Sequence, residues 1–393
     1  MNTPQLASIK ECTGCLACID SCPTESLSKI INEEGHLFYN LNIETCIHCN
    51  KCVNSCPVVS NLKYSLEGKG TFYAAWAKDN DIREKSASGG AFAAIAKYVL
   101  DNRGVVFGAA KSDICSVRHI HIEDNGKLSR IQGSKYTASD AVGSYKEAYY
   151  FLKEGRLVLF SGTGCQIAGL LSSLTKKSYR GNLITIDLIC GGIPSRLLIQ
   201  KFIENEPYKV KEIISFRTKD NGWKSSGFLY NMKVRDVDNR IHDYSGIRNL
   251  VIDGFCSELT NRYSCYDCKF NGIHRLSDYT IGDLWGDKDH LLEHKKGLSL
   301  VVAHTEKAIS LLTGLEKYLV TDSVDAAEAI KSNPRINNGG SYKKYMPERI
   351  YLSYLFNKMN YSTLKKIYAF DFPLYSPWII YKAYRYILTK LFR

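Results

Sequence analysis

Residues 12–23 read CTGCLACIDSCP, and residues 46–57 read CIHCNKCVNSCP. In both runs the cysteines follow one another at steps of three, three and four residues, and the fourth cysteine is followed by proline. The two runs are therefore an internal repeat with an offset of 34 residues. Thiolates at this spacing bind three corners of an iron–sulfur cubane, and the other run supplies the fourth ligand. The repeat therefore predicts two 4Fe–4S clusters.

The two clusters are expected to exchange the cysteine that precedes each proline. The expected ligand sets are Cys12, Cys15, Cys18 and Cys56 for the first cluster and Cys46, Cys49, Cys52 and Cys22 for the second. Structural zinc is the alternative, but zinc sites usually pair two separated knuckles around one ion, whereas each run here already holds four cysteines. Residues 1–62 thus resemble a dicluster ferredoxin domain, which carries electrons.

Length and composition narrow the class of protein to which the whole chain belongs. Its 393 residues allow two or three domains, and 45% hydrophobic with 23% charged residues is typical of a soluble globular protein. No membrane-spanning apolar stretch or secretory signal is recognisable, so we expect a cytoplasmic protein. Disulfides are rare in that compartment, so the 14 cysteines indicate metal binding or redox chemistry. The net charge is +12, but the basic residues are spread out without a nucleic-acid-binding signature, and we expect no nucleic-acid partner.

Residues 70–340 predict alternating strands and helices. Short apolar runs predict strands, and longer segments with apolar residues at helical spacing predict helices. The predicted strands are 71–78, 105–110, 157–160, 183–189, 213–218, 228–237 and 298–304, and the predicted helices are 89–100, 139–153, 166–174, one opened by Pro194, and 306–315. This order predicts an α/β core with a mixed, mainly parallel sheet.

Three loops of this core have the composition of phosphate- or flavin-binding loops. Residues 86–90 precede a predicted helix, whose free N–H groups favour an anion, and an ordinary serine N-cap is the alternative. Residues 161–166 connect a strand to a helix at the carboxyl end of the sheet, where ligands bind. Residues 132–136 add a lysine and a tyrosine beside a glycine, with a surface turn as the alternative. None of these loops is a dinucleotide-binding GxGxxG or Walker A motif.

Six cysteines lie outside the N-terminal repeat. Three of them share one loop, a fourth follows a predicted strand, and the four form a candidate third 4Fe–4S site. These cysteines are Cys256, Cys265, Cys268 and Cys190. Cys165 is the alternative fourth ligand, and zinc is the alternative metal, because a site with one CxxC pair is not diagnostic. Cys165 is also a candidate catalytic thiol, since a helix N-terminus lowers a thiol pKa. Cys115 is expected to be an apolar filler.

Seven segments form an ordered set along the chain. They are SGG at 88–90, GSKY at 133–136, GTGCQIAG at 162–169, DLICGGIPS at 187–195, CYDC at 265–268, RLSDYTIGDLWG at 275–286 and KGLS at 296–299. With these motifs the chain resembles the coenzyme F420 hydrogenase/dehydrogenase β subunit family, in a form with a fused N-terminal dicluster ferredoxin. The resemblance covers nearly the whole chain up to residue 340.

The resemblance implies FAD in the central body, together with an iron–sulfur cluster there. Carried onto the matching positions, FAD contacts are expected at Ser88, Gly89, Gly90, Ser134, Lys135, Tyr136, Gly162, Thr163, Gly164 and Gln166. The family usually has proline before the Cys-Gln pair, where this chain has Gly164, so we expect a more pliable turn. Asp278 and Asp283 join Cys165 as candidate catalytic residues. They would act as an acid/base pair or orient an arginine, and the alternative is a structural turn.

Clusters exchange single electrons, whereas a flavin handles both one-electron and two-electron steps. The combination predicts an iron–sulfur flavoprotein oxidoreductase. Its expected electron donor or acceptor is ferredoxin or a deazaflavin, and a redox step in surface polysaccharide synthesis is a variant. The alternative is a non-catalytic electron-transfer subunit that feeds a separate catalytic partner. A third hypothesis is a zinc-dependent interaction scaffold.

Residues 341–393 are the third predicted unit, a helical basic tail. Near the end of the chain, apolar residues occupy one helical face and basic residues the other, with Trp378 and several tyrosines beside them. This pattern suits peripheral contact with an anionic inner membrane surface. The alternative is a helix that docks on the body or on a partner subunit.

Overall fold

The computed structural model describes residues 3–60, 70–220, 222–223, 232–244, 249, 251–252, 255, 258, 260–338 and 358–367. The predicted ligand Cys256 and the predicted amphipathic segment around Trp378 lie outside these residues. Within the described ranges, no helix has both the length and the apolar character needed to cross a membrane.

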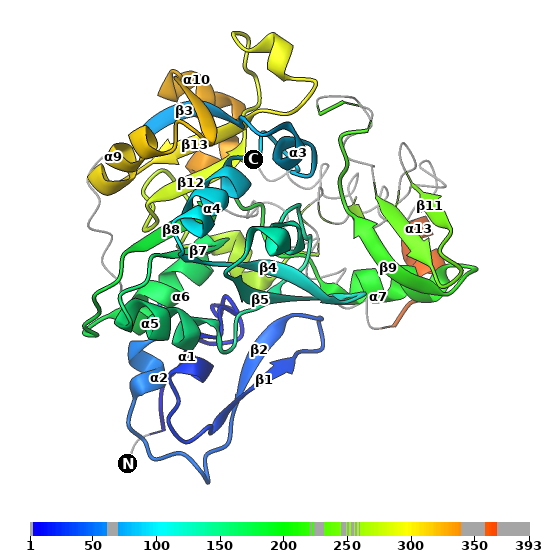
Figure 1. Ribbon diagram of the computed structural model, residues 1–393. Helices are drawn as coiled ribbons and strands as arrows, with labels where there is room; N and C mark the ends of the chain where they lie inside the picture. Colours follow the sequence, from blue (N-terminus) through cyan, green and yellow to red (C-terminus); the bar gives the residue numbers. More distant parts are fainter. Residues whose placement is uncertain are drawn as a thin grey trace, which may run out of the picture.

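The chain forms an N-terminal module, a central core and a side lobe (Figure 1). The module contains α1 (Ala17–Asp20), β1 (Leu27–Ile31), β2 (Leu37–Leu41) and α2 (Lys51–Asn54). The core contains β3 (Thr71–Ala77), α3 (Asn80–Glu84), α4 (Ala91–Asp101), β4 (Val105–Asp113), β5 (Ser116–Ile122), β6 (Ser139–Asp140), α5 (Ser144–Lys153), β7 (Val158–Thr163), α6 (Gly164–Leu174), β8 (Leu183–Leu188), β12 (Tyr279–Asp283), β13 (Ser299–Ala303), α9 (Glu306–Gly314), β14 (Leu319–Ser323), α10 (Ala326–Ser332) and α11 (Pro334–Asn338). The lobe contains α7 (Arg196–Asn205), β9 (Val210–Ser215), β10 (Lys233–Asp236), β11 (Ile241–Asp243) and α13 (Tyr361–Ile367).

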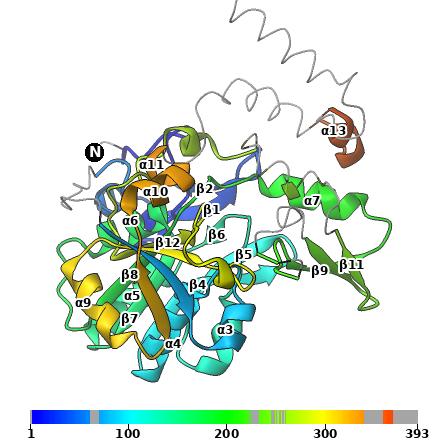
Figure 2. The same cartoon turned by 90° about the horizontal axis from the view of Figure 1, so that it is seen from above.

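One nine-stranded sheet organises the core, in the order β14-β3-β13-β12-β8-β7-β4-β5-β6. The four neighbours β12, β8, β7 and β4 run parallel to one another. Strands β13, β3 and β14 on one side, and β5 on the other, join the sheet in antiparallel pairs. The predicted mixed α/β core is confirmed, and its parallel part is concentrated in the centre. The lobe sheet β11-β10-β9 is antiparallel and stands beside the core with α7 and α13 (Figure 2).

Side chains of the central strands alternate between two buried faces. On β4, Val106 packs with α4, whereas the next residue, Phe107, packs with α5 and α6. Leu159 and Phe160 on β7 divide in the same way, and all four side chains are fully buried. Because successive strand residues point to opposite faces, a sheet covered on both faces needs continuous apolar runs. This is why short apolar runs predicted these strands correctly.

Two predicted helix starts differ from the structure. The segment 139–153 opens with the two-residue strand β6, and α5 begins at Ser144. Pro194 does not open α7, because the helix begins at Arg196 and Ser195 is its N-cap. The Ser195 hydroxyl oxygen accepts a hydrogen bond from the backbone N–H of Leu197 at 3.2 Å, which satisfies a donor of the first turn.

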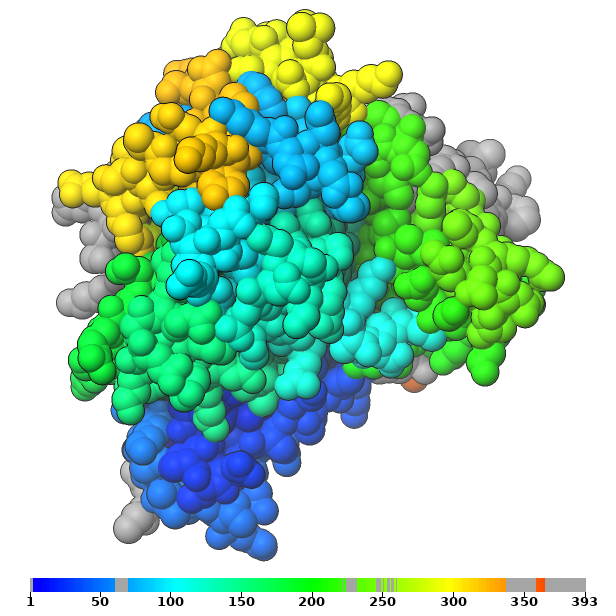
Figure 3. All heavy atoms as spheres, in the orientation of Figure 1, coloured from blue at the N-terminus to red at the C-terminus, as the bar shows by residue number. Residues whose placement is uncertain are grey.

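The N-terminal module is fastened to the core at the start of α5. The Asp20 carboxylate accepts hydrogen bonds from the backbone N–H groups of Gly143 (2.6 Å) and Tyr145 (3.1 Å). This negative charge lies where the helix dipole favours it. The Tyr145 hydroxyl in turn donates to the Cys15 carbonyl oxygen at 2.8 Å. These bonds hold the first cysteine run against the core, and Figure 3 shows the module as a blue lobe on its lower side.

Candidate functional site

Four cysteines of the N-terminal module line one small cavity of about 20 Å³. They are Cys12, Cys15, Cys18 and Cys56, the set expected for the first cluster. Burial raises the pKa of the Cys15 and Cys18 thiols, and the charges of neighbouring cysteines raise it further. The cavity therefore brings together thiols from both runs, as a shared cubane requires.

The second set of cysteines lies nearer the surface. Burial raises the pKa of Cys52, and so do the charges of Cys22 and Cys49. Cys49 is exposed, whereas Cys15, Cys18 and Cys56 are buried. The two runs also share a backbone hydrogen bond. The Gly14 N–H donates to the Cys12 sulfur, and the His48 N–H donates to the Cys46 sulfur, both at 3.4 Å. The two loops are thus built alike but differ in access to solvent.

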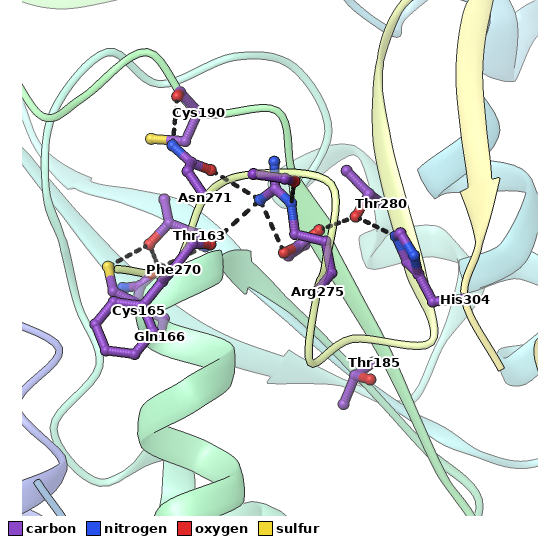
Figure 4. A network of polar contacts seen from close by, with 12 residues as sticks. Thr163, Cys165, Gln166, Thr185, Cys190, Phe270, Asn271, Arg275, Thr280 and His304 are labelled. Carbon is purple, nitrogen blue, oxygen red and sulfur yellow. Dashed lines mark hydrogen bonds and ion pairs between the residues drawn. The ribbon is translucent and has the colours of Figure 1, made fainter. Parts of the chain in front are cut away.

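A third group of thiols forms where the core sheet meets the module. Its members are Cys165, Cys190, Cys265 and Cys268. Burial raises the pKa of Cys265 to about 12, with further contributions from the charges of Cys190 and Cys165. Cys165 opens α6 and Cys190 follows β8, and Figure 4 shows both sulfurs at the left of a polar network. The structure therefore brings both alternative fourth ligands into the same group.

The two other cysteines of the core have different positions. Cys115 packs against the apolar core of the lobe, as expected for an apolar filler. Cys256 is outside the described residues. Among the described residues, no three His, Cys, Asp or Glu side chains converge on one ion position.

A buried ion pair supports the loop that carries Cys190. The Arg275 Nη1 donates to Asp187 Oδ2 at 3.1 Å and to Asn271 Oδ1 at 2.8 Å. The Asn271 amide then donates to the Cys190 carbonyl oxygen at 2.9 Å (Figure 4). Burial raises the pKa of Asp187, and the charge of Arg275 opposes this shift. The network connects the end of β8 to the segment after Cys268.

Gly164 explains how closely that segment approaches α6. A Cβ atom on Gly164 would lie 2.3 Å from the Phe270 carbonyl oxygen, far inside van der Waals contact. We expected glycine to make this turn more pliable, and the structure instead shows that residue 164 must lack a side chain for steric reasons. Glycine here lets the backbone beside Cys268 reach the first turn of α6.

A cavity of about 740 Å³ lies beside the third thiol group. Its walls include the carboxyl ends of the neighbouring parallel strands β7, β8 and β12, where open α/β sheets bind ligands. Of the expected cofactor contacts, it is lined by Ser88, Gly90, Ser134, Lys135, Tyr136, Gly162, Thr163 and Gln166. Gly89 and Gly164 do not line it, although their neighbours do. The volume is in the range of sites for cofactor-sized molecules.

Lys135 is the basic group of the predicted 132–136 loop. Its Nζ donates to the Gln132 carbonyl oxygen at 2.7 Å. Burial, and to a smaller extent the charge of Lys111, lowers the pKa of Lys135 to about 7. A partly buried ammonium beside a glycine loop fits an anionic group such as a phosphate, because the anion would compensate the lost hydration.

Two expected contacts are already engaged within the protein. Gln166 forms a capping interaction at the start of α6, because its Oε1 accepts from the Thr163 N–H at 3.1 Å. Its amide nitrogen donates to the Ser139 carbonyl oxygen at 3.1 Å. The Ser88 hydroxyl donates to the Leu298 carbonyl oxygen at 2.8 Å. These side chains shape the cavity wall, and backbone N–H groups and Lys135 remain the better anion contacts.

His119 lines the cavity but was not identified from the sequence. Its Nε2 lies 2.9 Å from the Ser161 carbonyl oxygen, which only accepts, so Nε2 carries the proton. Its Nδ1 then accepts from the Ser139 hydroxyl at 2.6 Å. Burial lowers the pKa of His119 to about 4. His119 is therefore a neutral wall residue whose tautomer is fixed by its neighbours.

Asp283 orients an arginine, one of its expected roles. Arg217 donates to both carboxylate oxygens, at 2.7 and 3.1 Å, and the Trp223 indole N–H donates at 2.9 Å. The Trp223 ring stacks on Trp285 with centroids 5.0 Å apart. Since Asp283 and Arg217 both line the cavity, this pair fixes a polar, charge-paired part of its wall.

Asp278 does not lie at the cavity, so the structure does not bring it together with Asp283 as an acid/base pair. Its carboxylate accepts from the Thr185 N–H at 2.9 Å and from Lys307 Nζ at 2.8 Å. It connects strand β8 to the start of α9. We interpret Asp278 as a structural residue.

We predict that Asp283→Asn destabilises the protein by about 3 kcal/mol, because breaking a buried pair leaves the Arg217 charge uncompensated. The pair is largely buried, with side-chain exposures of 7% for Arg217 and 16% for Asp283. Thermal unfolding of the purified variant measures the effect. Asp81→Asn, which breaks the exposed pair with Lys85, is the control and should change stability by less than about 0.5 kcal/mol. Equal small effects would contradict a structural role for the Arg217 pair.

Family models match three consecutive parts of the chain. Residues 11–61 match a 4Fe-4S dicluster domain, residues 72–145 match the coenzyme F420 hydrogenase/dehydrogenase beta subunit N-term model, and residues 155–327 match its C terminus model. A solved structure of the F420-reducing NiFe hydrogenase complex from Methanosarcina barkeri contains a similar chain. The similarity has 16% identity and a TM-score of 0.45, and covers 67% of this chain and 90% of that chain. No curated protein matches this chain.

Proposed function

Because this chain belongs to the coenzyme F420 hydrogenase/dehydrogenase beta subunit family and carries a 4Fe-4S dicluster domain, we propose that it is an iron–sulfur flavoprotein oxidoreductase. The observation that carries the proposal is the 740 Å³ cavity. Its wall contains Cys165 and Cys190 of the third thiol group, Lys135 of a glycine loop, and Gly14 of the first cluster loop. One space thus adjoins two sets of candidate iron ligands and a candidate anion site.

Three ligand sets follow from this proposal. The N-terminal sets are the two predicted from the repeat. For the third cluster we propose Cys165, Cys190, Cys265 and Cys268, because the charge of Cys165 acts on each of the other three thiols. In this assignment Cys165 is a ligand and not a catalytic thiol.

FAD is the cofactor that best fits the large cavity. Lys135 would compensate the charge of the diphosphate, and the backbone N–H groups before α4 and α6 would donate to its oxygens. The ring system of Tyr136 and Phe255, with centroids 4.4 Å apart, offers an apolar wall for an aromatic ring. Bound FAD would supply the conversion between one-electron and two-electron transfer.

The exposed position of Cys49 in the second cysteine set supports a direction of access. An external electron carrier would meet the loop of Cys49, and the substrate would meet the large cavity. We propose ferredoxin or a deazaflavin as the donor or acceptor, with a precursor of surface polysaccharides as the variant substrate. We also propose a cytoplasmic location, with peripheral membrane contact through residues 341–393.

The alternative is an electron-transfer subunit that feeds a separate catalytic partner. It is favoured by one finding, that the family models describe a beta subunit. In that case the large cavity would hold no flavin, or its flavin would serve only the partner.

Anaerobic purification with quantitation of iron, sulfide, zinc and flavin on one sample separates these functions. The oxidoreductase predicts about twelve irons and one FAD per chain, with reduction of a small molecule by the isolated protein. About eight irons and no flavin would overturn it in favour of the electron-transfer subunit. Stoichiometric zinc in place of iron would support the scaffold.

A further inference from the structure

Arg262 is a buried arginine that lies between two of the thiol groups. It is 4% exposed, and its Nε, Nη1 and Nη2 atoms are buried without a hydrogen-bond partner among the described residues. Burying an unpaired charge costs several kcal/mol, so such a group normally faces an opposite charge. Arg262 lies against the loop of Cys12 and directly before that of Cys265, so thiolates of these loops are candidates for that charge.

The Arg262 guanidinium lies directly against the first cysteine loop. A Cβ atom on Gly14 would be 1.9 Å from its Nη1, so only glycine leaves room for it. Gly14 has a φ of 64°, a left-handed conformation that also favours glycine. Next to this contact, the Ser264 hydroxyl donates to the Cys12 carbonyl oxygen at 3.0 Å, which holds the two loops together.

The same guanidinium acts on the third thiol group. Arg262 is three residues before Cys265, whose backbone N–H donates to the Arg262 carbonyl oxygen at 3.0 Å. Arg262 also lines the large cavity, together with Gly14 of the first cysteine loop and with Cys165 and Cys190 of the third thiol group. One cation therefore faces thiols of two different groups. The residues that line this cavity with Arg262 include no cysteine of the second set.

Two other arginines near this place carry paired charges. Arg275 binds Asp187 at 3.1 Å, and Arg335 binds Glu258 at 3.0 Å. Their carboxylates neutralise them locally, so they change the potential around the thiols less than an unpaired guanidinium does. Within the described residues Arg262 has no carboxylate partner.

We propose that Arg262 sets the reduction potentials of two clusters together, the first N-terminal cluster and the cluster of the Cys165 group. This inference rests on the proposed function, because it assumes that both groups hold 4Fe–4S clusters. Reduction adds one electron and one negative charge to a cluster, and no bond forms or breaks. A nearby guanidinium stabilises that added charge in a low dielectric, so it makes both clusters easier to reduce. Arg262 is a positioning and tuning residue and not a ligand.

The test compares Arg262→Met, Arg262→Lys and a control, Arg83→Met, in the full-length protein purified without oxygen. Arg83 is also buried, at 3% exposure, but it is paired with Glu293 and belongs to none of the thiol groups. Iron is counted first, and potentiometric titrations followed by electron paramagnetic resonance then give a midpoint for each cluster. We expect Arg262→Met to lower two of the three midpoints by about 59 mV or more, a tenfold weaker one-electron reduction. In Arg262→Lys we expect the midpoint potentials of these two clusters to stay close to those of the wild-type protein. In Arg83→Met the midpoint potentials of all three clusters should be unchanged.

Three outcomes would overturn the inference. Unchanged midpoints in Arg262→Met would remove the tuning role. A shift of equal size in Arg262→Lys would assign the effect to packing and not to charge. Loss of iron in both Arg262 variants would make the residue structural. The proposed function fails separately, when the wild-type protein itself holds fewer than about twelve irons.

Discussion

Cys165→Ser should lower the iron content from about twelve to about eight atoms per chain, whereas Cys256→Ser should leave it unchanged. The reason is that Cys165 lies in the same thiol group as Cys190, Cys265 and Cys268, since its charge raises the pKa of all three. A cubane that loses one of its protein thiolates is held by three, and we expect the cluster to be lost or reduced to a labile form. The two N-terminal clusters should stay, because their ligands are elsewhere in the chain.

Iron and sulfide analysis with visible absorbance measures this result, and Cys115→Ser is the matched control. Cys115 is a partly buried core cysteine that packs against the apolar core of the lobe, so it should retain all iron. The opposite outcome, iron loss in Cys256→Ser and none in Cys165→Ser, would restore the ligand set expected from the sequence. It would also return Cys165 to the role of a candidate catalytic thiol.

Lys135→Met should weaken FAD binding by about tenfold to a hundredfold, since a hydrogen bond to a charged group contributes about 1.5–3 kcal/mol. The partly buried ammonium of Lys135 is the basic group of the 132–136 loop at the cavity wall. Titration of flavin-free protein with FAD, followed by fluorescence quenching, gives the dissociation constant. Lys127→Met removes an exposed lysine of the same region and should leave the affinity unchanged.

The pH dependence of FAD binding tests the same residue. In the free protein burial lowers the pKa of Lys135 to about 7, and a bound diphosphate would raise it by favouring the charged form. Below pH 7 the lysine is charged in both states, so affinity is highest there. Above pH 7 the free protein must take up a proton to bind, and affinity should fall by up to about tenfold per pH unit until the pKa of the complex is reached. Lys135→Met should bind FAD without this dependence, and a persisting decline would assign it to another group.

Some properties of the protein are readable directly from its sequence. The two cysteine runs predict their chemistry because the ligands of a ferredoxin-type cluster are close together in the chain, and only one cysteine of each run is exchanged. The central strands are also predicted from local sequence, since a sheet buried on both faces requires continuous apolar runs such as 105–107 and 158–160. Strands β5, β12 and β14 were not predicted, because they lack the continuous apolar runs that mark the central strands.

Which distant side chains come together inside the core is determined only by the tertiary structure. The sequence favours Cys190 as the fourth ligand of a third cluster, with Cys165 as its alternative, and the adjacent parallel strands β7 and β8 bring both to one place. Asp278 and Asp283 lie five residues apart at opposite ends of β12, so only one reaches the carboxyl end of the sheet where the cavity lies. Arg217, Arg262 and His119 have no local signal at all. Their importance depends on the long-range packing that buries them beside groups far away in the chain, and spacing along a chain does not encode such distances.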